Sequence, residues 1–131
     1  MIFIDTNIAI ALRDVDPETH RLVGALGSVP VISIVTRIEL ENGVNREPAG
    51  VNLRRRLLDR FLGTIAVEMF THADVRVYGE IVYKLGYSRP LTLDRLIAAQ
   101  ALARDARLIT CNGADFRKIP GLRLEVWPSQ A

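Results

Sequence analysis

The opening segment, residues 2–7, is the feature that most constrains how this chain can fold. Three consecutive large apolar residues at positions 2–4 are followed at once by Asp5, Thr6 and Asn7. A short strand that is apolar at every position is typical of a parallel sheet with helices on both faces, because neither side of the strand meets water. Asp5 is then expected at the carboxyl end of this strand, the rim at which open parallel α/β sheets bind ligands.

Asp5 also has a simpler explanation as a helix cap. Asp, Thr and Asn are all favourable N-cap residues, and a short helix is predicted directly afterwards, from Ile8 to Leu12. The opening segment alone does not separate a cap from a functional carboxylate. The distinction depends on whether other acids converge on Asp5.

The rest of the chain alternates between helical and extended patterns. Such alternation predicts an α/β fold, a doubly wound and mostly parallel sheet of about five strands with helices on both faces. No repeat, low-complexity tract or linker interrupts it, so residues 1–131 are expected to form a single domain. The further strands are predicted at 31–33, 64–67, 107–110 and 122–126, and the further helices at 17–26, from Ser33 or Thr36 to Gly43, and at 51–61, 72–84 and 96–103.

Composition excludes several classes of site. No apolar run approaches the ~20 residues needed to cross a bilayer, so we expect a cytoplasmic protein without a membrane segment. Cys111 is the only cysteine, which excludes an internal disulfide and a thiolate zinc site, and His20 and His72 have no ligand spacing to each other. The formal net charge of +2 permits contact with a polyanion without requiring it.

Three further acids stand out, and each has an ordinary explanation when it is considered alone. Asp94 falls in the first turn of an apolar helix, where the helix dipole favours an acid by ~0.3–1 kcal/mol. Glu39 is flanked by apolar residues and is expected at the margin of the core, where a carboxylate needs a cation or hydrogen-bond donors. Asp115 follows the fourth strand as a loop acid, with Asn112 as a turn or cap residue.

Taken together, the four acids predict a metal site. Asp5 and the segment from Asn112 to Asp115 follow two strands, and Glu39 and Asp94 lie near helix starts that can face the same rim. Gathered carboxylates repel one another unless a cation lies between them. Hard oxygen ligands without a His or Cys set indicate Mg²⁺, with Mn²⁺ as the other possibility.

Four motifs occur in order along the whole chain. They are Phe3–Asn7, Thr36–Leu40 with Gly43, Leu93–Ala99, and Leu108–Asn112 with Asp115–Phe116 and Ile119–Gly121. With these motifs in this order, the chain resembles the PIN-domain family and, more closely, VapC-type toxins of bacterial type II toxin–antitoxin pairs.

The resemblance implies a fold, an activity and partners. The first and fourth strands would be neighbours, and the activity would be that of a Mg²⁺-dependent endoribonuclease that cleaves RNA, tRNA or another structured RNA, and inhibits translation and growth. The partners would be a cognate VapB-type antitoxin that plugs the site and a second copy of the chain, in a homodimer or in a heterotetramer or hetero-octamer with the antitoxin.

The resemblance also assigns roles to residues. Asp5, Glu39 and Asp94 match the acidic triad of the family, and the fourth acidic position is assigned to Asp115, with Asn112 as a polar helper that can take its place. The residues expected to support the carboxylates are Thr6, Asn7, Thr110 and Asn112, of which Thr6 and Thr110 are equally explained as caps.

RNA contacts are expected from arginines near the acids, because an acidic pocket repels a phosphate backbone unless cations hold it. The candidates are Arg13, Arg37, Arg89 and Arg95, each of which is also explained as a solvated residue. Arg54 to Arg56 are predicted to fan around a solvated helix face. The apolar stripe of Leu53, Leu57 and Phe61 is either core or a groove for an antitoxin helix.

Three other classes of function compete with a nuclease. A catalytically inactive RNA-binding scaffold would not need the intact acidic set. A Mg²⁺-binding phosphoacceptor domain would need an Asp after the third strand, where the chain has Glu68, Met69 and Phe70. A mononucleotide-binding domain would need a glycine-rich loop after the first strand, and none is present there.

Overall fold

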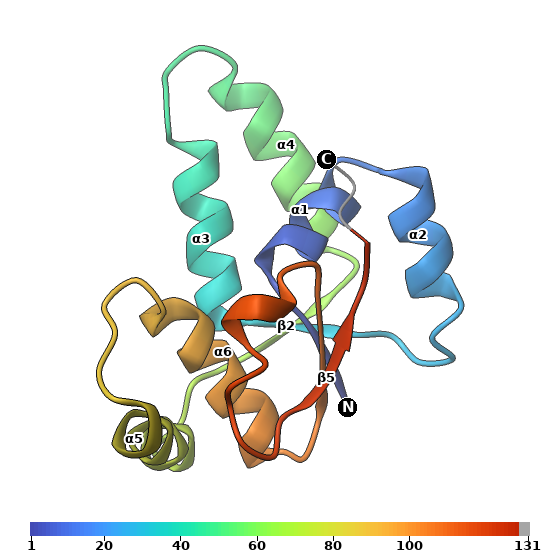
Figure 1. Cartoon of the computed structure of the whole chain (residues 1–131). Coiled ribbons are helices and arrows are strands. Elements are labelled where there is room, and N and C mark those ends of the chain that lie inside the picture. The colour runs from blue at the N-terminus through green and yellow to red at the C-terminus, as the bar shows by residue number, and fades with distance from the viewer. Residues whose placement is uncertain (129–131) are drawn as a thin grey trace.

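The fold is a parallel five-stranded sheet between two layers of helices (Figure 1). The structure is a computed structural model, and it describes residues 1–128. The strands are β1 (Ile2–Ile4), β2 (Val31–Ser33), β3 (Ala66–Glu68), β4 (Arg107–Thr110) and β5 (Arg123–Val126). The helices are α1 (Thr6–Arg13), α2 (Pro17–Gly24), α3 (Ile34–Val44), α4 (Val51–Leu62), α5 (His72–Leu85), α6 (Thr92–Ala103) and the 3-10 turn η1 (Gly113–Asp115).

The strand order β3-β2-β1-β4-β5 makes the sheet doubly wound. The chain runs outward from β1 to β3 and then crosses back to β4, so the order reverses between β1 and β4. These two strands are parallel neighbours, with Phe3 opposite Leu108 and Ile4 opposite Ile109. The predicted fold class and the predicted pairing of the first and fourth strands are both confirmed.

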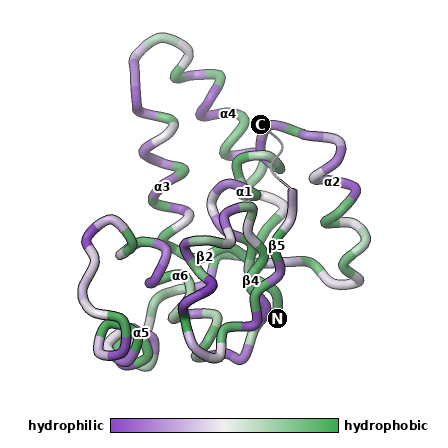
Figure 2. The backbone as a smooth tube through the Cα atoms, in the orientation of Figure 1, coloured by the Kyte–Doolittle hydropathy of each residue, from purple (hydrophilic) through white to green (hydrophobic). Residues whose placement is uncertain are grey.

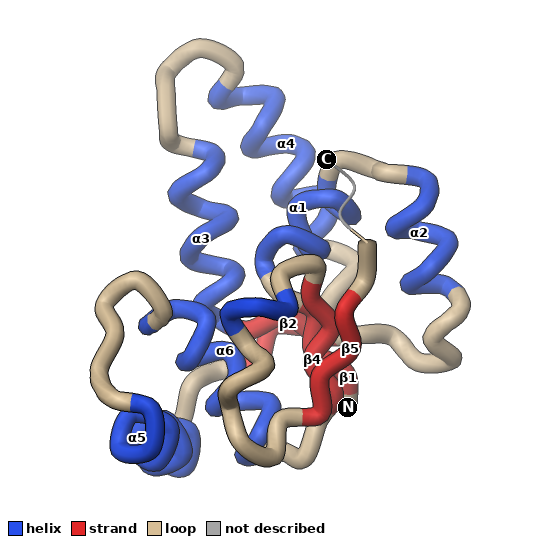
Figure 3. Tube along the Cα trace, viewed as in Figure 1, coloured by secondary structure: helices blue, strands red, loops and turns tan. Residues whose placement is uncertain are grey.

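Each face of the sheet is covered by its own hydrophobic core. Ile2 and Ile4 point into a core closed by α1, α3 and α4, whereas Phe3 points into the other core, closed by α5 and α6. The hydrophobic residues are accordingly concentrated along the central strands in Figure 2, and helices flank the sheet on both sides in Figure 3. This double burial explains why β1 has no polar position, since Phe3 and Ile4 are both 0% exposed.

Several element boundaries differ from the prediction by a few residues, and two of these differences have a local explanation. Helix α1 begins at Thr6, because the side chain of Asp5 caps it. Helix α6 begins at Thr92, one turn earlier than predicted. Strand β3 begins only at Ala66, because Thr64 is still bonded to the last turn of α4: both its amide and its hydroxyl donate to the carbonyl of Phe61.

Helices α3 and α4 extend away from the sheet as a hairpin (Figure 1). Arg54 holds the connection between them, because its guanidinium donates to the carbonyls of Val44, Glu47 and Ala49. The prediction that residues 54–56 are a solvated face is therefore wrong for Arg54, whose side chain is only 15% exposed.

The edge strand β3 is anchored by a buried ion pair. Asp74 of α5 is 1% exposed and accepts two hydrogen bonds from Arg104, which follows α6. Arg104 also contacts Glu68 of β3 at 3.3 Å. The pair therefore connects the α5–α6 layer to the end of the sheet.

Within residues 1–128, no helix is long and apolar enough to cross a membrane.

Candidate metal centre

Three of the predicted acids line one pocket at the carboxyl edge of the sheet. The pocket has a volume of ≈ 360 Å³. Asp5 lies at the end of β1, Glu39 on α3 and Asp94 on α6, so the fold brings together segments that are far apart in the chain. The pocket is lined by Asp5, Thr6, Asn7, Ile10, Glu39, Asp94 and Asn112.

Asp5 is both a helix cap and a buried carboxylate of the pocket. It is 5% exposed, and its Oδ1 accepts a hydrogen bond from the amide of Ile8 at 3.4 Å. Its Oδ2 accepts from the hydroxyl of Thr110 at the end of β4. Burial raises the pKa of Asp5, and the charge of Glu39 adds to this effect, against the hydrogen bonds that it accepts from Thr110 and the helix amides. The two interpretations of Asp5 are thus compatible.

Glu39 is held in the pocket by a threonine from α1. The hydroxyl of Thr6 donates to Oε1 of Glu39 at 2.6 Å. Glu41 lies on another side of α3, as the helix period predicts, and pairs with Arg37 and Arg55 instead. The supporting role predicted for Thr6 and for Thr110 therefore corresponds to hydrogen bonds to two different carboxylates.

The other acids of the site affect the pKa of Asp94. Burial in the first turn of α6 and the adjacent charge of Asp115 raise the pKa of Asp94 to about 6, with further contributions from Asp5 and Glu39. A favourable helix dipole alone would lower this pKa. Burial makes the largest contribution to this rise, and the smaller contributions from Asp115, Asp5 and Glu39 come from carboxylates in the same region.

The fourth position is divided between two residues. Asn112 lines the pocket and donates from Nδ2 to Oδ2 of Asp115 at 2.5 Å. Asp115 does not line the pocket, but it is close enough to Asp94 to raise that residue's pKa. Asn112 and Asp115 are therefore both placed to contribute to the fourth position. The choice between them, which the sequence left open, stays open.

The donor set suits a hard divalent cation. The pocket offers carboxylate, hydroxyl and amide oxygens and no thiolate or imidazole, which is the ligand chemistry of Mg²⁺ or Mn²⁺. As the side chains stand, no three acids, histidines or cysteines among residues 1–128 are close enough to hold one ion. Sharing an ion would therefore require rotation of the acidic side chains toward the pocket centre.

The predicted arginines lie in different environments. Arg13 pairs with Asp14 and Arg37 with Glu41, whereas Arg89 is exposed in the loop before α6. Arg95 is 6% exposed and donates to the carbonyl of Gly86 at 2.6 Å. Their contacts with RNA remain a prediction.

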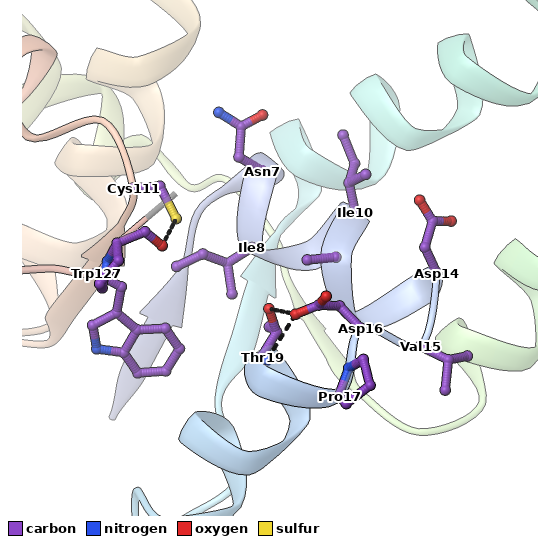
Figure 4. Close-up of a pocket in the computed structure, with 12 residues that line it drawn as sticks. Asn7, Ile8, Ile10, Asp14, Val15, Asp16, Pro17, Thr19, Cys111 and Trp127 are labelled. Atoms are coloured by element: carbon purple, nitrogen blue, oxygen red, sulfur yellow. Dashed lines mark hydrogen bonds between the residues drawn. The ribbon is translucent and has the colours of Figure 1, made fainter. Parts of the chain in front are cut away.

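A larger hollow of ≈ 600 Å³ adjoins the acidic pocket (Figure 4). The two share Asn7 and Ile10 in their linings. Most of the wall of the hollow is apolar and comes from α1, the start of α2 and the segment after β5, and its ionisable side chains are those of Asp14, Asp16 and Cys111. Cys111 is half-buried, and burial raises the pKa of its thiol.

One residue of the site was missed by the sequence reasoning. Thr36 is 0% exposed, and its hydroxyl lies 3.0 Å from that of Thr6. Its position three residues before Glu39 was a signal, since this spacing places both residues on one face of a helix. The sequence does not show that Thr6 approaches the same face from another helix.

Parallel strands with acidic side chains at the switch point define a class of doubly wound α/β domains that bind ligands at the carboxyl edge of the sheet. The sequence profile of the PIN domain matches residues 2–122. A curated relative, Ribonuclease VapC2 of Rickettsia felis, is 30% identical over 130 residues, which cover 95% of this chain and 96% of the relative. The chain therefore belongs to the PIN-domain family and, within it, to the VapC type.

Solved structures support the same assignment. The crystal structure of VapBC2 from Rickettsia felis, bound to a DNA fragment from its promoter, contains a chain that is 28% identical, with a TM-score of 0.86 over 97% of this chain and 99% of that one. The structure of VapBC-1 from nontypeable Haemophilus influenzae contains a chain that is 27% identical, with a TM-score of 0.77 over 97% of this chain and 98% of that one.

Proposed function

We propose that this protein is a metal-dependent endoribonuclease, the toxin of a VapBC-type toxin–antitoxin module. The observation that carries the proposal is the convergence of Asp5, Glu39 and Asp94 on one pocket. Burial raises the pKa of Asp94 to about 6, with Asp115 as the next contributor and smaller contributions from Asp5 and Glu39. The similarity to Ribonuclease VapC2 supports RNA as the substrate class.

The acidic side chains of the site would bind the metal, and the threonines would orient the acidic side chains. Asp5, Glu39 and Asp94 would hold Mg²⁺, or Mn²⁺ in its place, with Asp115 or Asn112 as the fourth contributor. When bound, a divalent cation neutralises phosphate charge and lowers the pKa of a water, which can then lose a proton and attack a phosphodiester. Thr110 and Thr6 orient Asp5 and Glu39 through the hydrogen bonds that they donate. No side chain of the protein needs to act as a nucleophile.

Arg89 is the best placed of the four arginines to hold RNA. Its side chain is exposed, and it lies five residues before Asp94 in the loop that leads into α6. Arg13 and Arg37 would first have to exchange their acidic partners for phosphate. The pocket is acidic, so these cations would supply the attraction that a polyanion needs.

A cognate antitoxin is the proposed protein partner. The hollow next to the acidic pocket has apolar walls and the carboxylates of Asp14 and Asp16, so it fits a polypeptide segment with apolar side chains and a basic residue better than it fits RNA. A segment lying there would also contact Asn7 and Ile10, which line the acidic pocket as well. The proposed assemblies are a homodimer, and a heterotetramer or hetero-octamer with the antitoxin, which light scattering on the purified complex would distinguish.

The central experiment is cleavage of a labelled RNA pool with Mg²⁺ and with EDTA. The wild-type protein is expected to cut RNA only with the metal, and Asp5→Asn and Asp94→Asn are each expected to abolish cleavage and growth inhibition. Asp59→Asn is the matched control, because Asp59 is an exposed acid on α4 outside the pocket. Circular dichroism would verify that every variant is folded.

Two outcomes of this experiment would contradict the proposal. Cleavage by both pocket variants would remove the metal-centre mechanism. Retention of full-length RNA by the wild type in Mg²⁺, together with RNA binding, would identify a catalytically inactive scaffold instead. Mapping of cleavage ends across the transcriptome after expression would identify the RNA, including whether tRNA is the target.

A further inference from the structure

The buried hydroxyl of Thr36 is not explained by its own helix. Thr36 lies in the first turn of α3, after the N-cap residue Ser33, and is 0% exposed. A valine would fill nearly the same volume without the cost of burying a hydroxyl. The polar contact of Thr36 is with Thr6, a residue of α1 that is 30 positions away in the chain. The hydroxyl is therefore retained for a contact between two helices.

The number of hydroxyl protons determines which of the two threonines donates the hydrogen bond. A threonine hydroxyl has a single proton to donate and can accept at its lone pairs, and an ionised carboxylate can only accept. Thr6 lies 2.6 Å from Oε1 of Glu39, so its proton is used in that bond. In the 3.0 Å hydrogen bond between the two threonines, Thr36 must then be the donor and Thr6 the acceptor.

A second threonine of the site has a similar arrangement of hydrogen bonds. The hydroxyl of Thr110 donates to Asp5 and accepts from the backbone amide of Asn112 at 2.9 Å. In both cases a threonine that holds a carboxylate also receives a hydrogen bond, which fixes the rotation of its hydroxyl. The backbone provides the donor for Thr110, whereas the side chain of Thr36 provides it for Thr6.

We propose that Thr36 is a positioning residue of the acidic centre, which acts through Thr6 to keep the carboxylate of Glu39 at the pocket. The proposal rests on the proposed function, since it gives Glu39 its role. Helix α3 thus provides two parts of the centre, the carboxylate itself and the donor that fixes its partner. The contact also ties α1 to α3 at the pocket wall.

Two substitutions separate the hydroxyl of Thr36 from its methyl group. Thr36→Val keeps the shape and removes the hydroxyl, and Thr36→Ser keeps the hydroxyl and removes the methyl. We expect Thr36→Val to weaken Mn²⁺ binding by about three- to tenfold, somewhat less than typical losses for groups that contact a ligand directly. Thr36→Ser is expected to bind Mn²⁺ like the wild type. A residue needed only for packing would show the opposite order.

The double variant tests whether Thr36 acts through Thr6. We call the hydrogen bonds from Thr36 to Thr6 and from Thr6 to Glu39 the relay. Thr6→Val alone is expected to weaken Mn²⁺ binding, and adding Thr36→Val should cause no further loss of affinity, because the relay is already broken. Titration calorimetry or Mn²⁺ electron paramagnetic resonance gives the dissociation constants, and thermal melts verify the fold. Proton NMR of the metal-free protein should show slowly exchanging hydroxyl protons of Thr6 and Thr36 with a cross-peak between them.

Failure of this inference differs from failure of the proposed function. If the wild type binds Mn²⁺ and Thr36→Val binds it equally well, or if the two losses add in the double variant, the relay is refuted and the nuclease proposal stands. If the wild type binds no Mn²⁺ and cuts no RNA, the proposed function is refuted. The NMR cross-peak then decides the relay by itself, and its absence would refute it.

Discussion

Replacement of Asp94 by Asn should stabilise the protein while it removes activity. Burial and the adjacent acids raise the pKa of Asp94 from 3.8 to about 6, which means that the folded state disfavours its charge. The difference of about two pKa units corresponds to ~3 kcal/mol at most. Asp94 is only partly buried, so solvent screening reduces this to ~1–2 kcal/mol.

The sign of the pH dependence follows from the raised pKa. The contribution of Asp94 to stability is fully present below its unfolded pKa of 3.8 and is lost as the pH rises through about 6. In EDTA at pH 7.5, Asp94→Asn should therefore raise the free energy of unfolding by ~1–2 kcal/mol. For a domain of this size the gain corresponds to a rise in Tm of about 3–8 °C. Near pH 4 the wild type and the variant should have the same stability.

Thermal and urea unfolding between pH 4 and pH 8 measure this effect. Asp59→Asn is the control, because this exposed residue should leave the pH profile unchanged. Added Mg²⁺ should stabilise the wild type at pH 7.5 and have little effect on Asp94→Asn, since metal binding to the native state adds to its stability. A variant that is less stable than the wild type at pH 7.5, or a difference that does not change with pH, would refute the reasoning.

Three further substitutions test other parts of the structure. Arg104→Met should lower the unfolding free energy by ~3 kcal/mol in urea titrations, because it leaves the buried carboxylate of Asp74 without its partner; a loss below ~1 kcal/mol would contradict this. Val15→Asn should raise stability by ~0.5–1 kcal/mol, since Val15 has φ = +60°, a conformation that suits asparagine better than a β-branched residue; unchanged thermal melts would argue against strain there. Arg89→Ala should weaken RNA binding and reduce its salt dependence without altering Mn²⁺ affinity, as measured by filter binding at several salt concentrations; an unchanged salt slope would exclude a phosphate contact.

The sequence determined the elements of the fold because their signals are local. An apolar triplet followed by Asp5 identified β1 and its end, and Gly86 identified the end of α5, where it has φ = +82°. Apolar strands alternating with amphipathic helices allow few arrangements other than a doubly wound sheet. The types and approximate bounds of the strands and longer helices were therefore predictable, with errors of one turn or less where caps decide the boundary.

The candidate site was predictable in its residues but not in its contacts. Asp5, Glu39 and Asp94 were identified from motifs, and the structure places all three at one pocket. The sequence did not show that Arg54 holds a loop or that Arg95 is buried against Gly86, because both are contacts between separate segments. Arginine side chains are long, and their partners depend on which backbone carbonyls the fold leaves within reach.

By itself, the sequence determined which side chains are chemically able to bind a divalent cation and which strand ends and helix starts carry them. Only the tertiary structure decided how these side chains are held: Thr110 donates to Asp5, Thr6 donates to Glu39, and Thr36 contacts Thr6. The physical reason is the range of the interactions. Strand and helix patterns are set by neighbours in the chain, whereas a hydrogen bond between residues 30 or 105 positions apart exists only after the sheet has brought its strands together.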